Sequence, residues 1–290
     1  MSFLSAQHAA KVVQMNGFYH LEGAFDPRYI AHLHAEFMQH FEHHLRSRPK
    51  PNRGPHRYQL LLPLNELFTA ERLLCNPAFF SVVRLLLGED CILGLMSAHV
   101  ALPGCEEQNA HIDYEPLFDT FLPLPPYCIY VHVPLVDITA ENGPTEFWQG
   151  SPHLAISSTI SSLSEFHTLP LSELPSTAVL AKAGDVIIKD MRCFHRGTAN
   201  KSQQPRPMLS LVYCKKWYRI PYEKLYREEG YPVHRIPTSL QLSSQVRSLL
   251  RFCDHSSLSS LDNKEEQAQE QDKIEEGEAH AKLAEQQQQY

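Results

Sequence analysis

The chain has 290 residues, 43% of them hydrophobic, which is enough for one large domain or two small ones with a sizeable core. Its net charge of −7 is concentrated at the end: residues 262–290 hold nine acidic and three basic side chains, and the rest is close to neutral. A near-neutral body argues against a nucleic-acid partner, and no apolar run approaches the length of a membrane span.

The seven cysteines are scattered, odd in number and without a C-x-x-C pair. No apolar, positively flanked leader opens the chain. Both features favour reduced, mostly buried thiols and a cytoplasmic location.

Residues 1–90 are expected to form a helical segment that packs on the domain that follows. Asp26-Pro27 offers an N-cap and a first-turn proline ahead of an apolar stripe that runs to about Arg46. Asn76-Pro77 and an apolar run closed by Gly88 indicate a second helix. Histidines on the first helix fall mostly on polar faces and are interpreted as surface residues: His32, His34, His40, His43 and His44.

Residues 91–250 are expected to form a mainly β domain, because short apolar segments alternate with Pro and Gly there. The candidate strands are Cys91–Val100, Ala110–Tyr114, Cys128–Asp137, Val179–Leu180, Val186–Lys189 and Met208–Lys216. Helices followed by closely spaced strands favour a β-sandwich or small jelly roll with helices on one face. Residues 251–290, rich in Glu and Gln, are expected to be a disordered or loosely helical acidic tail.

Two imidazoles and one carboxylate form a candidate metal site: His111 and Asp113, and far downstream His195. Side chains at positions i and i+2 of a strand point the same way, about 6.6 to 6.8 Å apart along it. Two histidines and one carboxylate make the facial triad of non-haem Fe(II) oxygenases. Zn²⁺ accepts the same ligands, which would make the site a hydrolase. Arg206, 11 positions after His195, can hold a dicarboxylate beside the metal.

Two further segments carry a resemblance to a known family. Glu141–His153 (ENGPTEFWQGSPH) and Ala183–Asn200 (AGDVIIKDMRCFHRGTAN), followed by Arg206-Pro207, closely resemble signatures of the phytanoyl-CoA dioxygenase family. With His111-Ile-Asp113 they occur in the family's order and spacing, and the resemblance covers roughly residues 10 to 220. It implies a double-stranded β-helix, a cupin-like jelly-roll barrel with the metal at its open mouth.

The resemblance also implies roles for single residues. Its metal ligands map onto His111, Asp113 and His195, and its arginine for 2-oxoglutarate maps onto Arg206. Thr145 and Gln108 resemble secondary contacts to the same co-substrate. Some relatives carry a serine two residues after the distal histidine, whereas this chain has Gly197. Asn142-Gly143-Pro144 is interpreted as a turn that delivers Thr145 into the barrel, and Asn200 as a support for the loop before Arg206.

The implied activity is that of an Fe(II)/2-oxoglutarate-dependent dioxygenase, with release of succinate and CO₂. Because Asp113 is present, hydroxylation is the expected outcome, whereas relatives that halogenate lack this carboxylate. A Pro-rich aromatic loop, residues 114–127, is expected to form a lid and favours a hydrophobic small-molecule substrate, of the acyl-CoA or natural-product type. The basic-aromatic stretch Lys215–Arg219 is a candidate contact for an anionic substrate group.

Two alternatives stay open at this stage. One is the Zn²⁺ hydrolase that uses the same three ligands. The other is a non-enzymatic jelly-roll binding protein whose acidic tail recruits partners. The sequence leaves the substrate and the oligomeric state unassigned.

Overall fold

The computed structural model of the chain describes residues 2–113, 117, 124–153, 171, 174–218, 220 and 239–250. The chain divides into two compact units, Met1–Arg251 and Phe252–Tyr290. The expected acidic tail, 251–290, lies outside the described residues.

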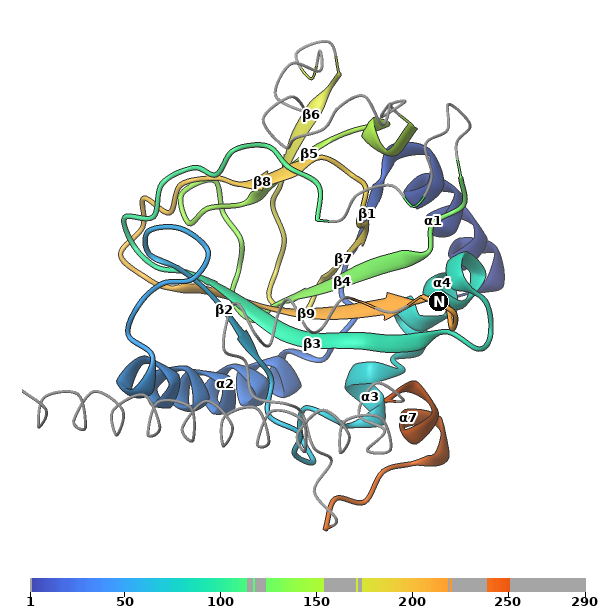
Figure 1. The fold of residues 1–290 in the computed structure, drawn as a ribbon, viewed down its shortest axis with the longest axis horizontal. Coiled ribbons are helices and arrows are strands. Elements are labelled where there is room, and N and C mark those ends of the chain that lie inside the picture. Colours follow the sequence, from blue (N-terminus) through green and yellow to red (C-terminus); the bar gives the residue numbers. More distant parts are fainter. Residues whose placement is uncertain are drawn as a thin grey trace, which may run out of the picture. The chain divides into compact units, whose positions relative to one another are not determined.

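Two antiparallel sheets form the body of the first unit (Figure 1). The larger sheet has the strand order β1-β7-β4-β9-β3-β2 and the smaller sheet the order β6-β5-β8. The strands are β1 (Phe18–Leu21), β2 (Arg57–Leu61), β3 (Ile92–Ala101), β4 (Cys128–Pro134), β5 (Thr145–Trp148), β6 (Ser176–Val179), β7 (Val186–Asp190), β8 (His195–Gly197) and β9 (Arg206–Cys214). Two facing antiparallel sheets with helices on one side confirm the predicted jelly-roll class.

The register of the large sheet determines which side chains face the small sheet. Paired residues in an antiparallel sheet point to the same face. Ser210 of β9 pairs with Ser97 on one side and His132 on the other, and Lys189 of β7 pairs with Tyr130. Lys189 contacts the strand that carries His195, so this face is the inner one. Its buried polar residues are Arg57, Gln59, Ser97, His132, Lys189, Arg206 and Ser210.

The outer face of the same sheet is apolar and packs on helices. Leu209, Leu211 and Tyr213 of β9 are fully buried. The hydroxyl of Tyr213 donates to the carbonyl of Leu74 at 2.6 Å, and the ring of Phe80 lies 5.9 Å from that of Tyr213. Each such side chain contributes about 1.5–3 kcal/mol when it leaves water. The core of the unit therefore lies between sheet and helices, which leaves the polar inner face available for chemistry.

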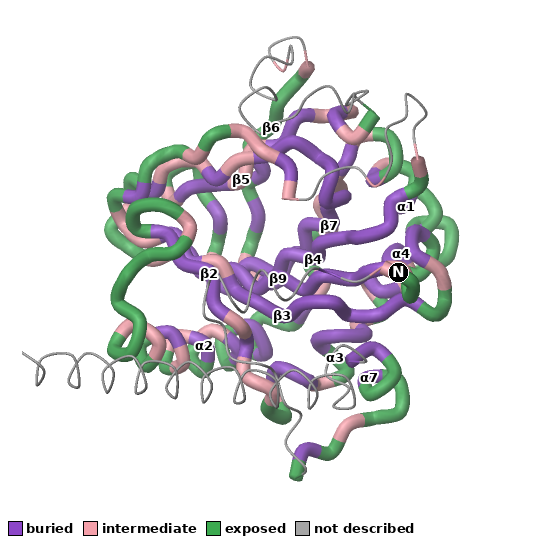
Figure 2. The backbone as a smooth tube through the Cα atoms, viewed as in Figure 1, coloured by how far each residue is buried: buried purple, intermediate pink, exposed green. Residues whose placement is uncertain are grey.

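The helices are α1 (Phe3–Asn16), α2 (Pro27–Ser47), α3 (Glu71–Leu74), α4 (Pro77–Leu87), α7 (Ser244–Leu249) and the 3₁₀ turn η1 (Ser151–His153). Two of them, α2 and α4, begin and end close to where the sequence predicts, whereas the others were not predicted. Asp26 caps α2 by accepting from the backbone of Arg28, and Asn76 caps α4 by accepting from that of Ala78. The stripe of α2 expected from the sequence is its buried side, while its opposite side is exposed (Figure 2).

The N-terminal segment differs from the expected purely helical one. Besides helices, residues 1–90 supply both edge strands of the large sheet, β1 and β2. The strand expected at Ala110–Tyr114 is also wrong in its described part, because His111 forms only an isolated bridge with His195. The strands expected in β3, β4, β6, β7 and β9 are present, with ends shifted by a few residues.

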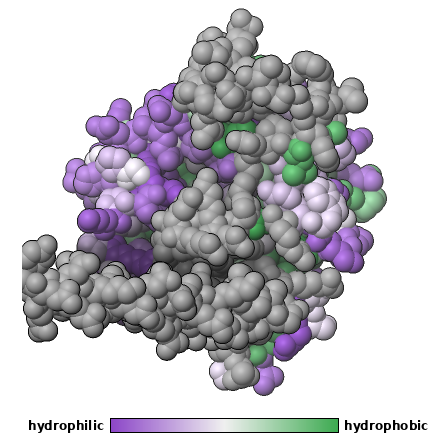
Figure 3. Space-filling model, viewed as in Figure 1, coloured by the Kyte–Doolittle hydropathy of each residue, from purple (hydrophilic) through white to green (hydrophobic). Residues whose placement is uncertain are grey.

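None of the helices in the described ranges combines the length and apolar content needed to cross a membrane. On the face seen in Figure 3, described hydrophobic side chains appear as small separate patches among hydrophilic ones. The six cysteines within the described residues are buried and form no disulfide, as predicted.

Candidate metal and co-substrate site

His111 and His195 lie directly opposite each other across an isolated antiparallel bridge. The backbone N–H of each donates to the carbonyl of the other, both at 2.9 Å. Two residues that exchange both backbone hydrogen bonds direct their side chains to the same face, and the two ring centroids are 4.5 Å apart. A single bridge thus aligns the side chains of His111 and His195, without the strand that was expected at Ala110–Tyr114.

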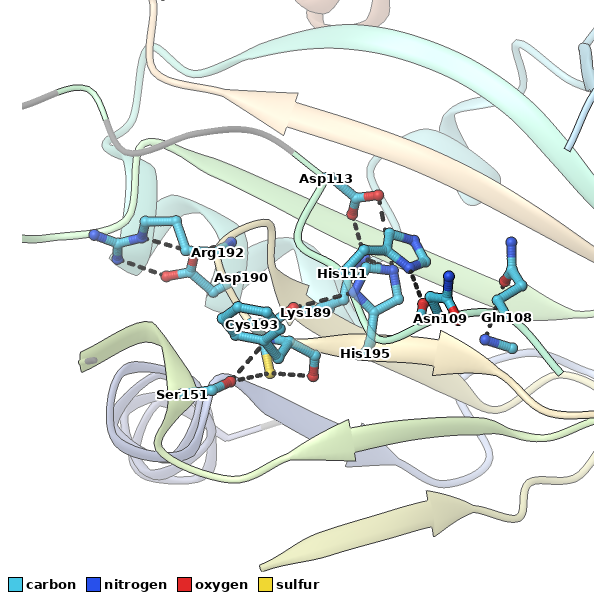
Figure 4. A network of polar contacts seen from close by, with 12 residues as sticks. Gln108, Asn109, His111, Asp113, Ser151, Lys189, Asp190, Arg192, Cys193 and His195 are labelled. Carbon is cyan, nitrogen blue, oxygen red and sulfur yellow. Dashed lines mark hydrogen bonds and ion pairs between the residues drawn. The ribbon is translucent and has the colours of Figure 1, made fainter. Parts of the chain in front are cut away.

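Asp113 joins the pair from the chain just beyond His111. Its backbone N–H donates to the carbonyl of Met191 at 3.2 Å, which fixes this segment beside the turn between β7 and β8. The ligand atoms of His111, Asp113 and His195 all lie within 4.8 Å of one another. Figure 4 shows the three side chains converging from two distant stretches of sequence. The structure therefore brings the three expected metal ligands together.

Hydrogen bonds to the backbone orient both imidazoles. Nδ1 of His111 lies 2.8 Å from the carbonyl of Asn109, and Nδ1 of His195 lies 3.0 Å from the carbonyl of Cys193. A carbonyl can only accept, so each Nδ1 carries the proton and each Nε2 presents a lone pair. Metal-binding histidines are held in this way by partners on their second nitrogen. Both rings are thus prepared to bind through Nε2.

The ionisation states also suit a metal. Burial alone would raise the pKa of Asp113, but the nearby Lys189, His195 and His111 together hold it below its ordinary value, so the carboxylate is charged. Burial and then Lys189 lower the pKa of His195 well below its ordinary value, so the ring is neutral. A charged carboxylate and neutral imidazoles are the forms that bind a divalent ion.

Sequence reasoning missed Lys189, which lies inside this group. It is only 1% exposed, and its ammonium donates to Oδ2 of Asp113 and, at 2.9 Å, to Nε2 of His195. A signal was present in the sequence, because a lysine ends the apolar run Val186-Ile187-Ile188 of an expected buried strand. Such a lysine needs an anionic partner inside the protein.

Arg206 opens β9 on the inner face and is 3% exposed. Its Nε and Nη1 atoms are buried and have no hydrogen-bond partner within the described residues. Burial, and then the nearby Arg57, lower its pKa to about 10, so the guanidinium stays charged at neutral pH. A buried charge with unused donors is costly unless an anion pairs with it. A planar fork of this kind suits a carboxylate.

The loop that leads into Arg206 is held by Asn200, as predicted. The carboxamide of Asn200 donates to the carbonyls of Ala101 and Gln204 and accepts from the backbone of Ser202. Asn200 itself is 1% exposed. Its role is to support the loop and so to fix where β9 begins.

The turn at Asn142-Gly143-Pro144 leads into Thr145, the first residue of β5. Gly143 has φ +85°, and a Cβ there would lie 2.9 Å from the carbonyl oxygen of Thr198. Glycine is therefore required at this close approach. Thr145 pairs with Gly197 of β8, which places it next to the strand of His195.

Gln108 is bound to β8 through both its backbone and its side chain. Its backbone donates to the carbonyl of Gly197 at 2.9 Å, and its side-chain oxygen accepts from the backbone of Gly197 at 3.0 Å. A Cβ at Gly197 would lie 2.6 Å from Nη1 of Arg57. The space of the serine found in some relatives is therefore filled by Arg57 and Gln108.

The other candidate contacts fall partly outside the described ranges. Of the expected lid, residues 114–127, only 117 and 124–127 are described, and Arg219 also lies outside. Trp217 is 61% exposed, and its ring lies 6.2 Å from that of Tyr127. Lys215 donates to the carbonyl of Leu87. Of these aromatic side chains only Trp217 is exposed, whereas Tyr127 is buried in the core and Tyr218 is partly buried.

Several solved structures share this fold at low sequence identity. The epimerase SnoN, solved in complex with Fe³⁺, alpha ketoglutarate and nogalamycin RO, is 19% identical, with a TM-score of 0.56 over 76% of this chain and 88% of SnoN. The carbocyclase SnoK from nogalamycin biosynthesis is 18% identical, with a TM-score of 0.54 over 79% and 93%. AviO1 from Streptomyces viridochromogenes Tue57 is 17% identical, with a TM-score of 0.58 over 76% and 99%.

The sequence itself matches a family described as phytanoyl-CoA dioxygenase (PhyH) over residues 13–208. This range includes all three candidate metal ligands, Arg206 and every strand of both sheets except the part of β9 after Met208. Fe(II) and 2-oxoglutarate, predicted from the resemblance, are the cofactor and co-substrate of that family. The chain belongs to the phytanoyl-CoA dioxygenase family of non-haem iron, 2-oxoglutarate-dependent enzymes.

Proposed function

We propose that this protein is an Fe(II)/2-oxoglutarate-dependent dioxygenase that hydroxylates a hydrophobic small molecule and releases succinate and CO₂. His111, Asp113 and His195 would hold the iron. Arg206 would bind the distal carboxylate of 2-oxoglutarate, with Thr145 and Gln108 as secondary contacts. The bound iron supplies the oxidising chemistry with O₂, and the chain's own residues position the reactants.

One observation carries this proposal: the three candidate metal ligands and the buried Arg206 lie on the same side of the large sheet. One ligand atom from each of the three residues lies within 4.8 Å of the other two, and Nε2 of His195 is 3.7 Å from Oδ1 of Asp113. On the same side of the large sheet, Arg206 is charged, buried and has two donors without a partner in the described part of the chain. A cation site and an anion site on one face fit a keto acid that binds metal at one end and arginine at the other.

The polar inner face between these two groups supports a co-substrate pocket. His132 of β4 and Ser210 of β9 pair with each other, and each has a buried polar atom without a hydrogen-bond partner in the described ranges. Burial lowers the pKa of His132 well below its ordinary value, so the ring is neutral there. Buried polar atoms without partners are rare and usually mark a ligand or water site.

The expected substrate class rests on aromatic side chains close to the segment that carries the metal ligands. Met191 accepts from the backbone of Asp113, and its own N–H donates to Cys128 at 3.4 Å. Tyr127 lies just before Cys128, the first residue of β4, and the exposed Trp217 stacks against it. Aromatic rings at this place favour a hydrophobic substrate, of the acyl-CoA or natural-product type.

The test is a substrate screen with stoichiometry. Purified protein is supplied with Fe(II), 2-oxoglutarate and O₂, together with acyl-CoA thioesters, the matching free acids, or polycyclic aromatic compounds. We expect one substrate class to raise succinate formation above the uncoupled level and to gain one oxygen atom from ¹⁸O₂. Hydrolysis that proceeds with Zn²⁺ and without O₂ would instead support the hydrolase alternative.

A further inference from the structure

The ammonium of Lys189 occupies the position where the metal ligands converge. Lys189 is on the inner face of β7, paired with Tyr130 of β4 and Phe18 of β1. Its Nζ donates to Asp113 and His195 and lies 4.5 Å from the centre of the Tyr130 ring (Figure 4). The side chain is 1% exposed, so the ammonium lies in the protein interior.

The contact with His195 conflicts with metal binding. The Nδ1 proton of His195 is donated to the carbonyl of Cys193, so Nε2 holds the ring's one available lone pair. That lone pair accepts from Lys189 at 2.9 Å. It can point at an ammonium or at a metal ion, but not at both. Asp113 has two oxygens and is able to serve both cations, so the conflict rests on His195.

An ammonium displaced from His195 has the neutral ring of His132 as a neighbouring acceptor. His132 is the diagonal neighbour of Lys189, since Lys189 pairs with Tyr130 and His132 pairs with Ile187. Such neighbours are about 7–8 Å apart, within reach of a long side chain. Nδ1 of His132 has no hydrogen-bond partner in the described ranges. A neutral ring is a poorer partner for a buried ammonium than a carboxylate.

We propose that Lys189 is an internal cation that competes with the metal for His195 and, once displaced, binds a carboxylate of 2-oxoglutarate. This inference rests on the proposed function. Lys189 then weakens metal binding when the co-substrate is absent, because two positive charges share one small interior. The dicarboxylate gives the ammonium a new anionic partner, so metal and co-substrate bind cooperatively. By linkage, each raises the affinity of the other by the same factor.

The test measures metal affinity, not turnover. Co(II) is titrated anaerobically into the full chain and followed by its visible absorption, with and without saturating 2-oxoglutarate. Lys189→Met removes the charge at nearly constant volume, and Lys189→Gln removes it while keeping a polar group. Lys182→Met, an exposed lysine paired with Asp137, is the matched control.

Without 2-oxoglutarate, we expect both Lys189 variants to bind Co(II) at least tenfold more tightly than the wild type, and Lys182→Met to bind it equally. With 2-oxoglutarate, the wild type should tighten by a larger factor than either Lys189 variant. If both Lys189 variants bound Co(II) no more tightly than the wild type without 2-oxoglutarate, the role proposed for Lys189 would be wrong, while the metal site would stand. If His195→Ala bound Co(II) as tightly as the wild type, the metal site itself would be wrong.

Discussion

The guanidinium of Arg57 fills the space beside Gly197. Its Nη2 donates to the carbonyls of Gly197 at 3.1 Å, Thr198 at 2.6 Å and Glu106 at 2.8 Å. One side chain of β2 therefore ties together the segment that carries Gln108 and the strand that carries His195. The N-terminal part of the chain thus positions the candidate metal site in addition to covering the barrel.

Gly197→Ser should destabilise the fold, although serine is found at this place in some relatives. A Cβ at Gly197 would lie 2.6 Å from Arg57 and 2.7 Å from Gln108. Displacing the buried guanidinium from its carbonyls should lower the free energy of unfolding by roughly 1–3 kcal/mol. Urea denaturation measures the change. In an Arg57→Ala background the serine should cost less, and strictly additive costs would refute the shared space.

Arg206→Lys should weaken 2-oxoglutarate binding and leave metal binding intact. Lysine keeps the charge but loses the planar fork that grips a carboxylate with two parallel bonds. We expect roughly a tenfold to hundredfold rise in Kd, from a charged hydrogen bond of about 1.5–3 kcal/mol. Anaerobic calorimetry with Co(II)-loaded protein measures both affinities. Arg72→Lys, at an exposed arginine, serves as the control, and an unchanged Kd in Arg206→Lys would remove this residue from the co-substrate site.

Asn200→Ala should affect the same affinity from a distance. The side chain of Asn200 fixes the loop before Arg206 through the carbonyls of Ala101 and Gln204. Removing it takes a donor from the carbonyl of the buried Ala101, at a cost of about 1–3 kcal/mol in unfolding free energy. The Kd for 2-oxoglutarate should rise while the absorption of bound Co(II) stays as in the wild type. Lost stability with an unchanged Kd would limit Asn200 to folding.

Much of this arrangement follows from sequence, and the exceptions have physical causes. The caps at Asp26 and Asn76 and the apolar stripes of their helices are local signals, so α2 and α4 were predictable. The three metal ligands were predictable as residue types because their chemistry demands them. β1 and β2 were not, because their place at the sheet edges depends on β7 and β3, which are distant in sequence.

The contents of the inner face were the hardest part to predict. Alternation along β9 indicates two faces, but it does not show that Arg57 from residues 1–90 occupies the space beside Gly197. Lys189 was missed for the same reason: its partners Asp113 and His195 come from other segments. Thr145 and Gln108 stay predictions as co-substrate contacts. The side-chain oxygen of Gln108 already accepts a hydrogen bond from the backbone of Gly197.

His99 should make the fold sensitive to acid in a defined window. Burial, and then Arg53, lower its pKa from 6.5 to about 3. The unfolded chain therefore takes up a proton below about pH 6.5 that the folded protein refuses until about pH 3, so stability falls as the pH falls through this range. One such group contributes a slope of about 1.4 kcal/mol per pH unit.

His99→Gln tests this slope directly. Between pH 6 and pH 4, the unfolding free energy measured with urea should fall less steeply with pH than in the wild type. The difference in slope should be about 1.4 kcal/mol per pH unit, the contribution of one proton. His32→Gln, at an exposed histidine of α2, should leave the slope unchanged. If His99→Gln retained the full wild-type slope, the ring would be solvated and free to take up a proton in the folded protein.

Anaerobic titration with Fe(II) and 2-oxoglutarate is the most direct test of the metal and co-substrate site. In the wild type, one Fe(II) should bind per chain, and a weak visible charge-transfer band should appear only when the keto acid is also present. His195→Ala and Asp113→Ala should each weaken the band strongly, because only two of the three ligands remain in each variant and hold the ion less tightly. A band of wild-type strength in either variant, or no band in the wild type with both ligands saturating, would contradict the site assigned to His111, Asp113, His195 and Arg206.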